Sequence, residues 1–133
     1  MESSLDIVVR STEIDEVGHV NNAKYLEYLE WGREDWYALT GFAAERLAEQ
    51  NIATVVVNIN INYRREAKKG ERLTIVTRPV RKGHTSFVVR QKIYNREGDC
   101  VVDADVTIVM FDLYERQSTP IPESLTHVFS EKK

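Results

Sequence analysis

The spacing of hydrophobic residues changes along the chain from the helical period of about 3.6 residues to the strand period of two. Between residues 22 and 40 apolar side chains recur at helical spacing, while charged residues three and four apart form one narrow stripe: Lys24, Glu27, Glu30 and Glu34. This pattern predicts a helix about 28 Å long. Apolar residues fill most of the remaining circumference, so we expect the helix to be buried on more than one side. These residues are Tyr25, Leu26, Tyr28, Leu29, Gly32, Trp36 and Leu39.

Both ends of this helix carry local signals. Asn21 is a good N-cap residue, and Val20 and Tyr25 then have the spacing of a hydrophobic staple. Gly41 is a plausible C-terminal stop. Gly32 lies inside the helix, where glycine costs ~1 kcal/mol relative to alanine, so a packing reason such as close approach to a sheet is expected.

Before and after the helix the pattern indicates strands. An apolar run at residues 5–10 predicts a first strand, and residues 11–20 read as a loop. Beyond residue 52, apolar and polar residues alternate with a period of two. The alternation predicts strands over 55–64, 73–80, 85–94 and 100–110, where Pro79 suggests an edge, a bulge or a strand end.

The remaining segments are short. Residues 42–51 are expected to form a short helical or irregular connector and 81–84 a hairpin loop. A short terminal helix is expected over 122–129, followed by a tail at 130–133. Because short turns join the later strands, the sheet should be antiparallel. One helix against one such sheet is an α+β architecture.

Composition narrows the function classes. The 133 residues fit a single domain, 1–133, and 42% hydrophobic with 29% charged residues fit a globular protein. A net charge of −3 with mixed signs predicts no nucleic-acid partner. Cys100 is the single cysteine, so we expect no intrachain disulfide, and we predict no metal and no cofactor. No signal peptide or membrane span is apparent, and a cytoplasmic protein is expected.

A motif surrounds the start of the helix, with the form D-x-x-G-H-V-N-N-x-x-Y…E-x-x-R. Its residues are Asp15, Gly18, His19, Val20, Asn21, Asn22, Tyr25, Glu30 and Arg33. Together with the order of elements, the motif resembles the 4-hydroxybenzoyl-CoA / acyl-CoA thioesterase family, which has the hot-dog fold. The resemblance implies an antiparallel five-stranded sheet wrapped around one long central helix. It also implies a homodimer or homotetramer, with subunits paired edge to edge and active sites at the dimer interface.

The resemblance further implies that Asp15 is the catalytic acid and that a backbone N–H at the helix start polarises the thioester carbonyl. Free amides at a helix N-terminus suit that task, and we expect the Asn22 N–H, with or without that of Ala23, to bind the oxyanion. Asp15 would act as a general base on water or as a nucleophile. The alternative is that Asp15 is only a loop cap or a surface charge. The H-G-G motif of another thioesterase branch is absent, so Glu27 and Glu30 are not assigned a catalytic role.

Substrate-binding candidates come from several segments, each with a plainer alternative. Gly18 and His19 flank the helix start, although histidine there is more often structural. Tyr25 is either a core aromatic or an acyl-chain contact. Asn58 and Asn60 belong either to a solvated sheet face or to a strand bordering the partner's site. Four basic residues are candidates for binding the phosphates of coenzyme A, namely Arg64, Arg65, Lys82 and His84. The alternative is that they are ordinary charged residues of turns.

These features favour a thioester hydrolase acting on acyl-CoA. An acyl-ACP thioesterase and a non-catalytic acyl-binding hot-dog module remain as alternatives. A hydratase would need an acid–histidine pair aimed at a carbon–carbon bond, which Asp15 and His19 do not convincingly offer.

Overall fold

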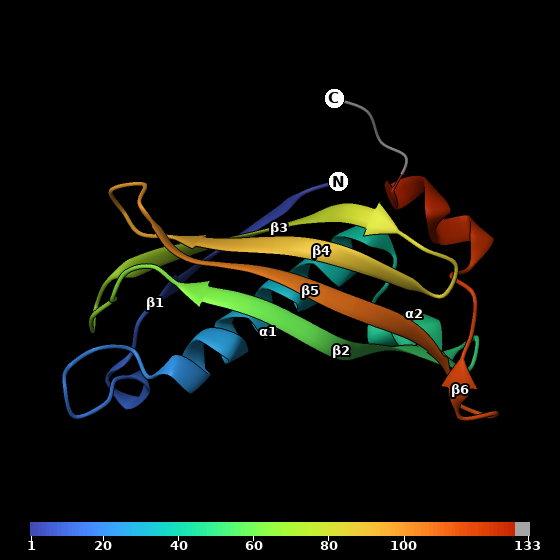
Figure 1. The fold of residues 1–133 in the computed structure, drawn as a ribbon, viewed down its shortest axis with the longest axis horizontal. Helices are drawn as coiled ribbons and strands as arrows, with labels where there is room; N and C mark the ends of the chain where they lie inside the picture. The colour runs from blue at the N-terminus through green and yellow to red at the C-terminus, as the bar shows by residue number, and fades with distance from the viewer. Residues whose placement is uncertain (130–133) are drawn as a thin grey trace.

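The computed structural model describes residues 1–129, which form one curved antiparallel sheet and one long helix (Figure 1). The strand order is β1-β3-β4-β5-β2, with β6 paired to β5. The strands are β1 (Ser3–Val8), β2 (Ile52–Tyr63), β3 (Arg72–Lys82), β4 (Ser86–Tyr94), β5 (Cys100–Asp112) and β6 (Gln117–Ser118). The helices are α1 (Asn22–Thr40), α2 (Ala44–Ala48) and the 3-10 helices η1 (Ser11–Glu13) and η2 (Glu123–Phe129). The predicted α+β class is confirmed.

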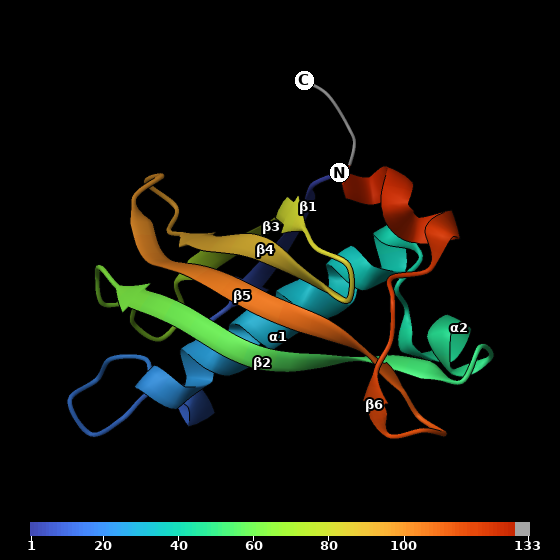
Figure 2. The ribbon, with the colours of Figure 1, turned by 45° about the vertical axis from the view of Figure 1, so that its right-hand side comes forward.

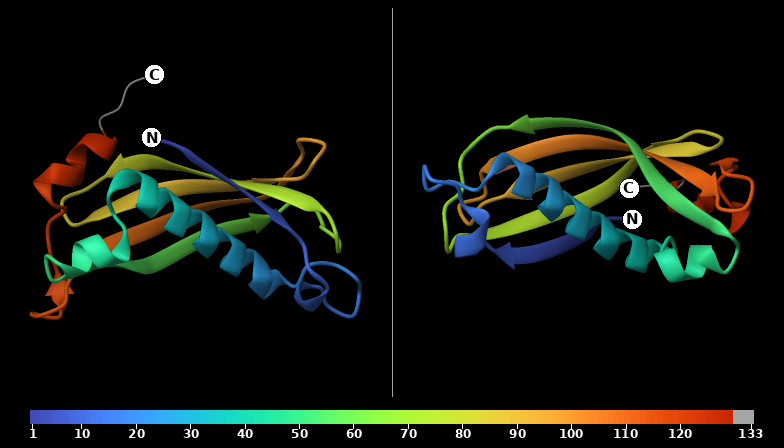
Figure 3. Two further views of the ribbon diagram at one scale, coloured as in Figure 1. Left: turned by 180° about the vertical axis from the view of Figure 1, so that it is seen from behind. Right: turned by 90° about the horizontal axis from the view of Figure 1, so that it is seen from below.

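Helix α1 lies diagonally across the concave face of the sheet, as the views from behind and below show (Figure 3). The helix comes very close to the sheet at Gly32. A Cβ placed there would lie 2.6 Å from Ile75 Cγ2 and 3.0 Å from Gln91 Nε2, so a side chain does not fit. The packing reason predicted for this glycine is therefore confirmed.

The outer side of α1 is open in the single chain. The exposed fractions of its apolar side chains are 38% for Leu26, 37% for Trp31 and 54% for Leu39. The prediction that the helix is buried on more than one side is wrong for the single chain, because the sheet curls along one side of the helix only (Figure 2).

The predicted helix ends agree with the structure. The Asn21 side chain accepts a hydrogen bond from the Ala23 N–H at 2.8 Å. Gly41 adopts φ +93° and donates its N–H to the Tyr37 carbonyl at 3.1 Å. Val20 and Tyr25 are buried in the same part of the core, as a hydrophobic staple requires.

Strand boundaries differ from the prediction by a few residues. Strand β1 begins two residues earlier, and β3 continues to Lys82, which shortens the hairpin loop to residues 83–85. The register shifts between Pro79 and Arg81, so the bulge is confirmed among the three alternatives for this proline. Strand β6 makes the sheet six-stranded rather than five-stranded, since two residues are too few to show a periodic pattern.

The core has two parts, one at each end of α1. One surrounds Tyr28 and Leu29 beneath the first half of the helix. The other is aromatic, with Trp36 stacked on Phe42 at 5.7 Å between ring centroids. Between them Gln91 is fully buried, and its side chain bonds to the Leu29 carbonyl, Thr77 and Arg33.

The terminal segments complete the comparison with the sequence. The short helix predicted over 122–129 is the 3-10 helix η2. The predicted tail, 130–133, lies outside the described residues. Within the described part of the chain, no helix is long and apolar enough to cross a membrane.

Candidate active site

The loop that carries Asp15 is a tight hairpin leading into α1. Ile14 pairs with Val20, the Asp15 N–H donates to the His19 carbonyl at 2.8 Å, and the Gly18 N–H donates to the Asp15 carbonyl at 3.0 Å. Gly18 has φ +93°, which glycine adopts without strain. The loop is also attached to the segment after β2, because the Val20 N–H donates to the Ala67 carbonyl at 2.9 Å.

The Asp15 carboxylate is half-buried and faces its own loop. Its Oδ1 accepts hydrogen bonds from the Val17 N–H at 3.0 Å and the His19 N–H at 3.4 Å. Its Oδ2 accepts none from residues 1–129. The structure therefore shows the loop-capping arrangement considered for Asp15 and leaves one carboxylate oxygen available.

The amides at the start of α1 are not equivalent. The Ala23 N–H is occupied by the Asn21 side chain, and the Lys24 N–H donates to the Asn21 carbonyl at 2.9 Å. The Asn21 N–H donates to the Glu13 carbonyl. Within residues 1–129 the Asn22 N–H has no hydrogen-bond partner, so it is the amide free to meet an anionic oxygen.

A hollow of about 290 Å³ is lined in part by Asn22. It gathers five residues predicted from the sequence, namely His19, Asn22, Tyr25, Arg64 and Arg65. Val20, Tyr63 and Glu66 complete its lining. Asp15 and Gly18 do not line it but are joined to it through His19 and the hairpin.

Two of the charged groups in this hollow are already engaged. His19 Nε2 contacts Glu66 Oε1. Arg64 Nε bonds to Asp103 Oδ2 at 2.6 Å, and this contact holds the pKa of Asp103 below its usual range. Arg65 is only loosely paired, 4.0 Å from Asp99, with a side chain 60% exposed. Arg65 is therefore the more available cation for a phosphate group.

Tyr25 is buried beneath the hollow. It is 2% exposed, and its hydroxyl has no hydrogen-bond partner within the described residues. Burial raises its pKa to about 12, and the nearby Ala67 N–H, which does not reach hydrogen-bonding geometry with the hydroxyl, offsets this only in part. The ring packs edge-on to Tyr28 and at a tilt to Tyr63. Tyr25 is thus a neutral phenol in the wall of the site.

Four predicted binding residues lie elsewhere in the single chain. Lys82 and His84 lie in and just after the end of β3, near η2, where the Ile121 N–H donates to the His84 carbonyl (Figure 1). Asn60 lines a polar hollow on the outer sheet face, and Asn58 is exposed beside a bulge in β2. A single chain does not bring these residues to Asp15, and for Asn58 and Asn60 it shows the solvated face.

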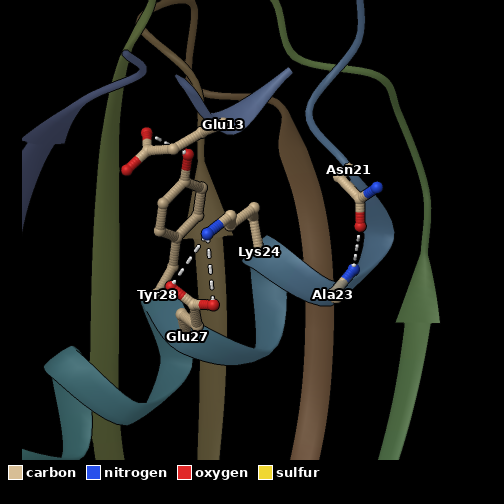
Figure 4. Close-up of polar contacts among 6 residues, drawn as sticks. All are labelled: Glu13, Asn21, Ala23, Lys24, Glu27 and Tyr28. Atoms are coloured by element: carbon tan, nitrogen blue, oxygen red, sulfur yellow. Dashed lines mark hydrogen bonds and ion pairs between the residues drawn. The ribbon is translucent and has the colours of Figure 1, made fainter. Parts of the chain in front are cut away.

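The site includes groups that the motif did not indicate. Tyr63 and Glu66 enter the hollow from the end of β2, and no local pattern connects them with the helix start. Glu13 is 8% exposed and bonds to the Tyr28 hydroxyl at 2.8 Å (Figure 4). Only the folded chain brings these residues together. No group of three or more His, Cys, Asp and Glu side chains in residues 1–129 is arranged to hold a metal ion.

Comparison with known proteins fits this geometry. The profile of the Thioesterase-like superfamily matches residues 9–129, so the chain belongs to that superfamily. It is 40% identical over 121 residues to the long-chain acyl-CoA thioesterase FadM of Escherichia coli K12, covering 90% of each chain. The family predicted from the motif is confirmed, and the relative's name agrees with the predicted class of enzyme.

Solved structures give the same result for the fold. The crystal structure of the Escherichia coli probable thioesterase YbaW superposes with a TM-score of 0.81 at 36% identity, covering 94% of each chain. A Staphylococcus aureus protein solved in complex with CoA has a TM-score of 0.91 at 15% identity, covering 96% of this chain and 81% of that one. These likenesses confirm the hot-dog fold.

Proposed function

We propose that this protein hydrolyses acyl-CoA thioesters to a free acid and CoA, with Asp15 and the Asn22 N–H at the reacting centre. The observation that carries the proposal is that Asn22, whose N–H has no hydrogen-bond partner within residues 1–129, lines a hollow beside the Asp15 hairpin. Membership of the thioesterase-like superfamily and the 40% identity to an acyl-CoA thioesterase support the choice of reaction and substrate.

The chemistry needs an oxyanion site and an activated nucleophile. The Asn22 N–H, at the positive end of the α1 dipole, would bind the carbonyl oxygen as negative charge develops on it. Asp15 would then take a proton from water as the water oxygen bonds to the carbonyl carbon, or attack that carbon itself to form an anhydride that water opens. In either route the C–S bond breaks and the CoA thiolate leaves and takes up a proton.

The coenzyme A portion is assigned to the basic rim of the hollow. Arg65 and Arg64 lie there, beside His19 and close to Gly18. Charge-assisted contacts from arginine suit phosphates. Lys82 and His84 are too far along the sheet to join them in one chain, so in this proposal only a second subunit would bring them to the site.

A second copy of the chain is proposed to pair along β2. This strand is an edge of the sheet formed by residues 1–129, and it exposes three consecutive valines, Val55, Val56 and Val57. A long apolar edge strand left open would promote uncontrolled association. Pairing there would extend the sheet and place Asn58 and Asn60 near the partner's site, in a cytoplasmic homodimer or homotetramer.

A thiol-release assay tests the activity. Purified protein is supplied with hexanoyl-, palmitoyl- or benzoyl-CoA, and free CoA is followed with a thiol reagent. Release from at least one substrate, with the matching oxygen ester inert, is the expected result. No release from any of the three would contradict acyl-CoA hydrolysis and favour a binding module or an acyl-ACP substrate.

A further inference from the structure

A buried carboxylate, Glu13, lies between the Asp15 hairpin and the body of α1. Glu13 is 8% exposed, and Tyr28, which donates its hydroxyl to Glu13 Oε1 at 2.8 Å, is fully buried. The same oxygen accepts the Arg10 N–H at 2.9 Å. A buried carboxylate is costly unless such hydrogen bonds satisfy it, so these contacts are a built feature of the fold.

Glu13 also holds the helix start through its backbone. Its carbonyl accepts the Asn21 N–H at 3.0 Å, and Asn21 in turn caps α1 through Ala23 (Figure 4). One residue therefore bonds to the N-cap of α1 through its main chain and to the second turn of α1 through its side chain. Asp15 follows Glu13 by two residues, so its position depends on this attachment.

The attachment also reaches the wall of the hollow. The Tyr28 ring meets Tyr25 edge-on at 6.0 Å between centroids, and Tyr25 lines the hollow with Asn22. Burial and the hydrogen bond to Glu13 raise the pKa of Tyr28, so its hydroxyl remains a donor at all physiological pH values. By contrast, the nearby Lys24–Glu27 pair is exposed and links only neighbouring turns of one helix.

We infer that Glu13 is a positioning residue, which through Tyr28 fixes the Asp15 carboxylate relative to the free Asn22 amide. Glu13 does not line the hollow and does not contact substrate in this account. The inference rests on the proposed function, since it assigns Glu13 a role through Asp15. A displacement of about 1 Å at a reacting group can cost on the order of 10²-fold in rate.

The test compares Glu13→Ala with Glu13→Gln, which keeps an acceptor oxygen for Tyr28 and Arg10. With the acyl-CoA turned over fastest by the wild type, Glu13→Ala should lower kcat at least ~10-fold and change KM by less than ~3-fold. Glu13→Gln should stay within ~3-fold of the wild type. Thr40→Val removes a buried hydrogen bond to the Trp36 carbonyl at the other end of α1 and should leave kcat unchanged.

Measuring Glu13→Ala in a protein that also carries Asp15→Asn separates an effect on the position of Asp15 from a general loss of structure. If Glu13 acts through Asp15, Glu13→Ala should cost less than ~2-fold when Asp15 is already asparagine. Full kcat in Glu13→Ala, or an equal loss in both backgrounds, would overturn the inference. These results differ from failure of the proposed function, in which the wild type releases no thiol or Asp15→Asn keeps the full rate.

Amide hydrogen exchange gives a readout that needs no activity. Glu13→Ala should speed exchange at least ~10-fold at the Asp15 and Asn21 amides, which are hydrogen-bonded in the hairpin and at the cap. Exchange at Gly41, at the far end of α1, should not change. Unchanged exchange at Asp15 and Asn21 in the folded variant would also overturn the inference.

Discussion

Gly32 of α1 faces Ile75 of β3 so closely that a Cβ on the glycine would lie 2.6 Å from Ile75 Cγ2. Real Cβ contacts are not that short, so the helix reaches the sheet only because position 32 has no side chain. The contact sets the depth of α1 in the sheet, and with it the position of the helix start.

Gly32→Ala should therefore destabilise the protein even though alanine is the better helix former. Overpacking costs roughly 1–3 kcal/mol, against ~1 kcal/mol gained in helix propensity. Urea unfolding should show a net loss, and the loss should shrink when Ile75 is also changed to alanine. A stabilised Gly32→Ala variant would show that the helix can move away from the sheet freely.

Changing either of two neighbouring buried tyrosines to phenylalanine should affect the free energy of unfolding differently. Tyr28→Phe removes the donor to the buried Glu13 carboxylate and should lower the free energy of unfolding by roughly 1–3 kcal/mol. Tyr25→Phe removes a buried hydroxyl that has no partner in residues 1–129, so stability should change by less than ~0.5 kcal/mol or rise. Equal destabilisation of the two variants would contradict the hydrogen-bond assignment.

The local parts of this site were predictable from the sequence, and the non-local parts were not. Asn21 and Gly41 mark the ends of α1 because caps act within a few residues. The exposure of Leu39 was not predictable, because helical spacing shows which side chains share a face of the helix but not whether another part of the protein covers that face.

The Glu13–Tyr28 contact was hidden for another reason. It joins residues 15 positions apart through a loop, and a glutamate in a polar loop reads as a surface charge. Gln91 of β4 is fully buried, yet its three partners come from α1 and β3 and follow no sequence pattern.

The two arginines of the hollow should differ in their effect on coenzyme A binding. Arg65→Ala should raise KM for acyl-CoA several-fold and spare an acyl-N-acetylcysteamine thioester, which lacks the phosphates. Arg64→Ala should have a smaller effect on KM because Arg64 is held by Asp103. Equal effects of Arg65→Ala on both substrates would remove the phosphate assignment.

If two subunits pair along β2, a charged substitution on that strand should lower the mass of the assembly. Val57 is 57% exposed on that edge strand, and Val8, 50% exposed on the opposite edge strand β1, is a matched control. By sedimentation equilibrium the wild type should be a dimer or tetramer, Val57→Asp should shift toward monomer, and Val8→Asp should not. A monomeric wild type, or dissociation only in Val8→Asp, would rule out pairing along β2.

The most direct test of the central claim is kcat for thiol release by Asp15→Asn. Asparagine keeps an Oδ1 that can accept the Val17 and His19 amides, so the loop cap and the stability should survive the change. The substitution removes the negative charge that residue 15 needs to act as a general base or a nucleophile. The account predicts a fall in kcat of at least ~10²-fold with the unfolding midpoint nearly unchanged. Full kcat in Asp15→Asn would contradict it and leave Asp15 as a loop cap alone.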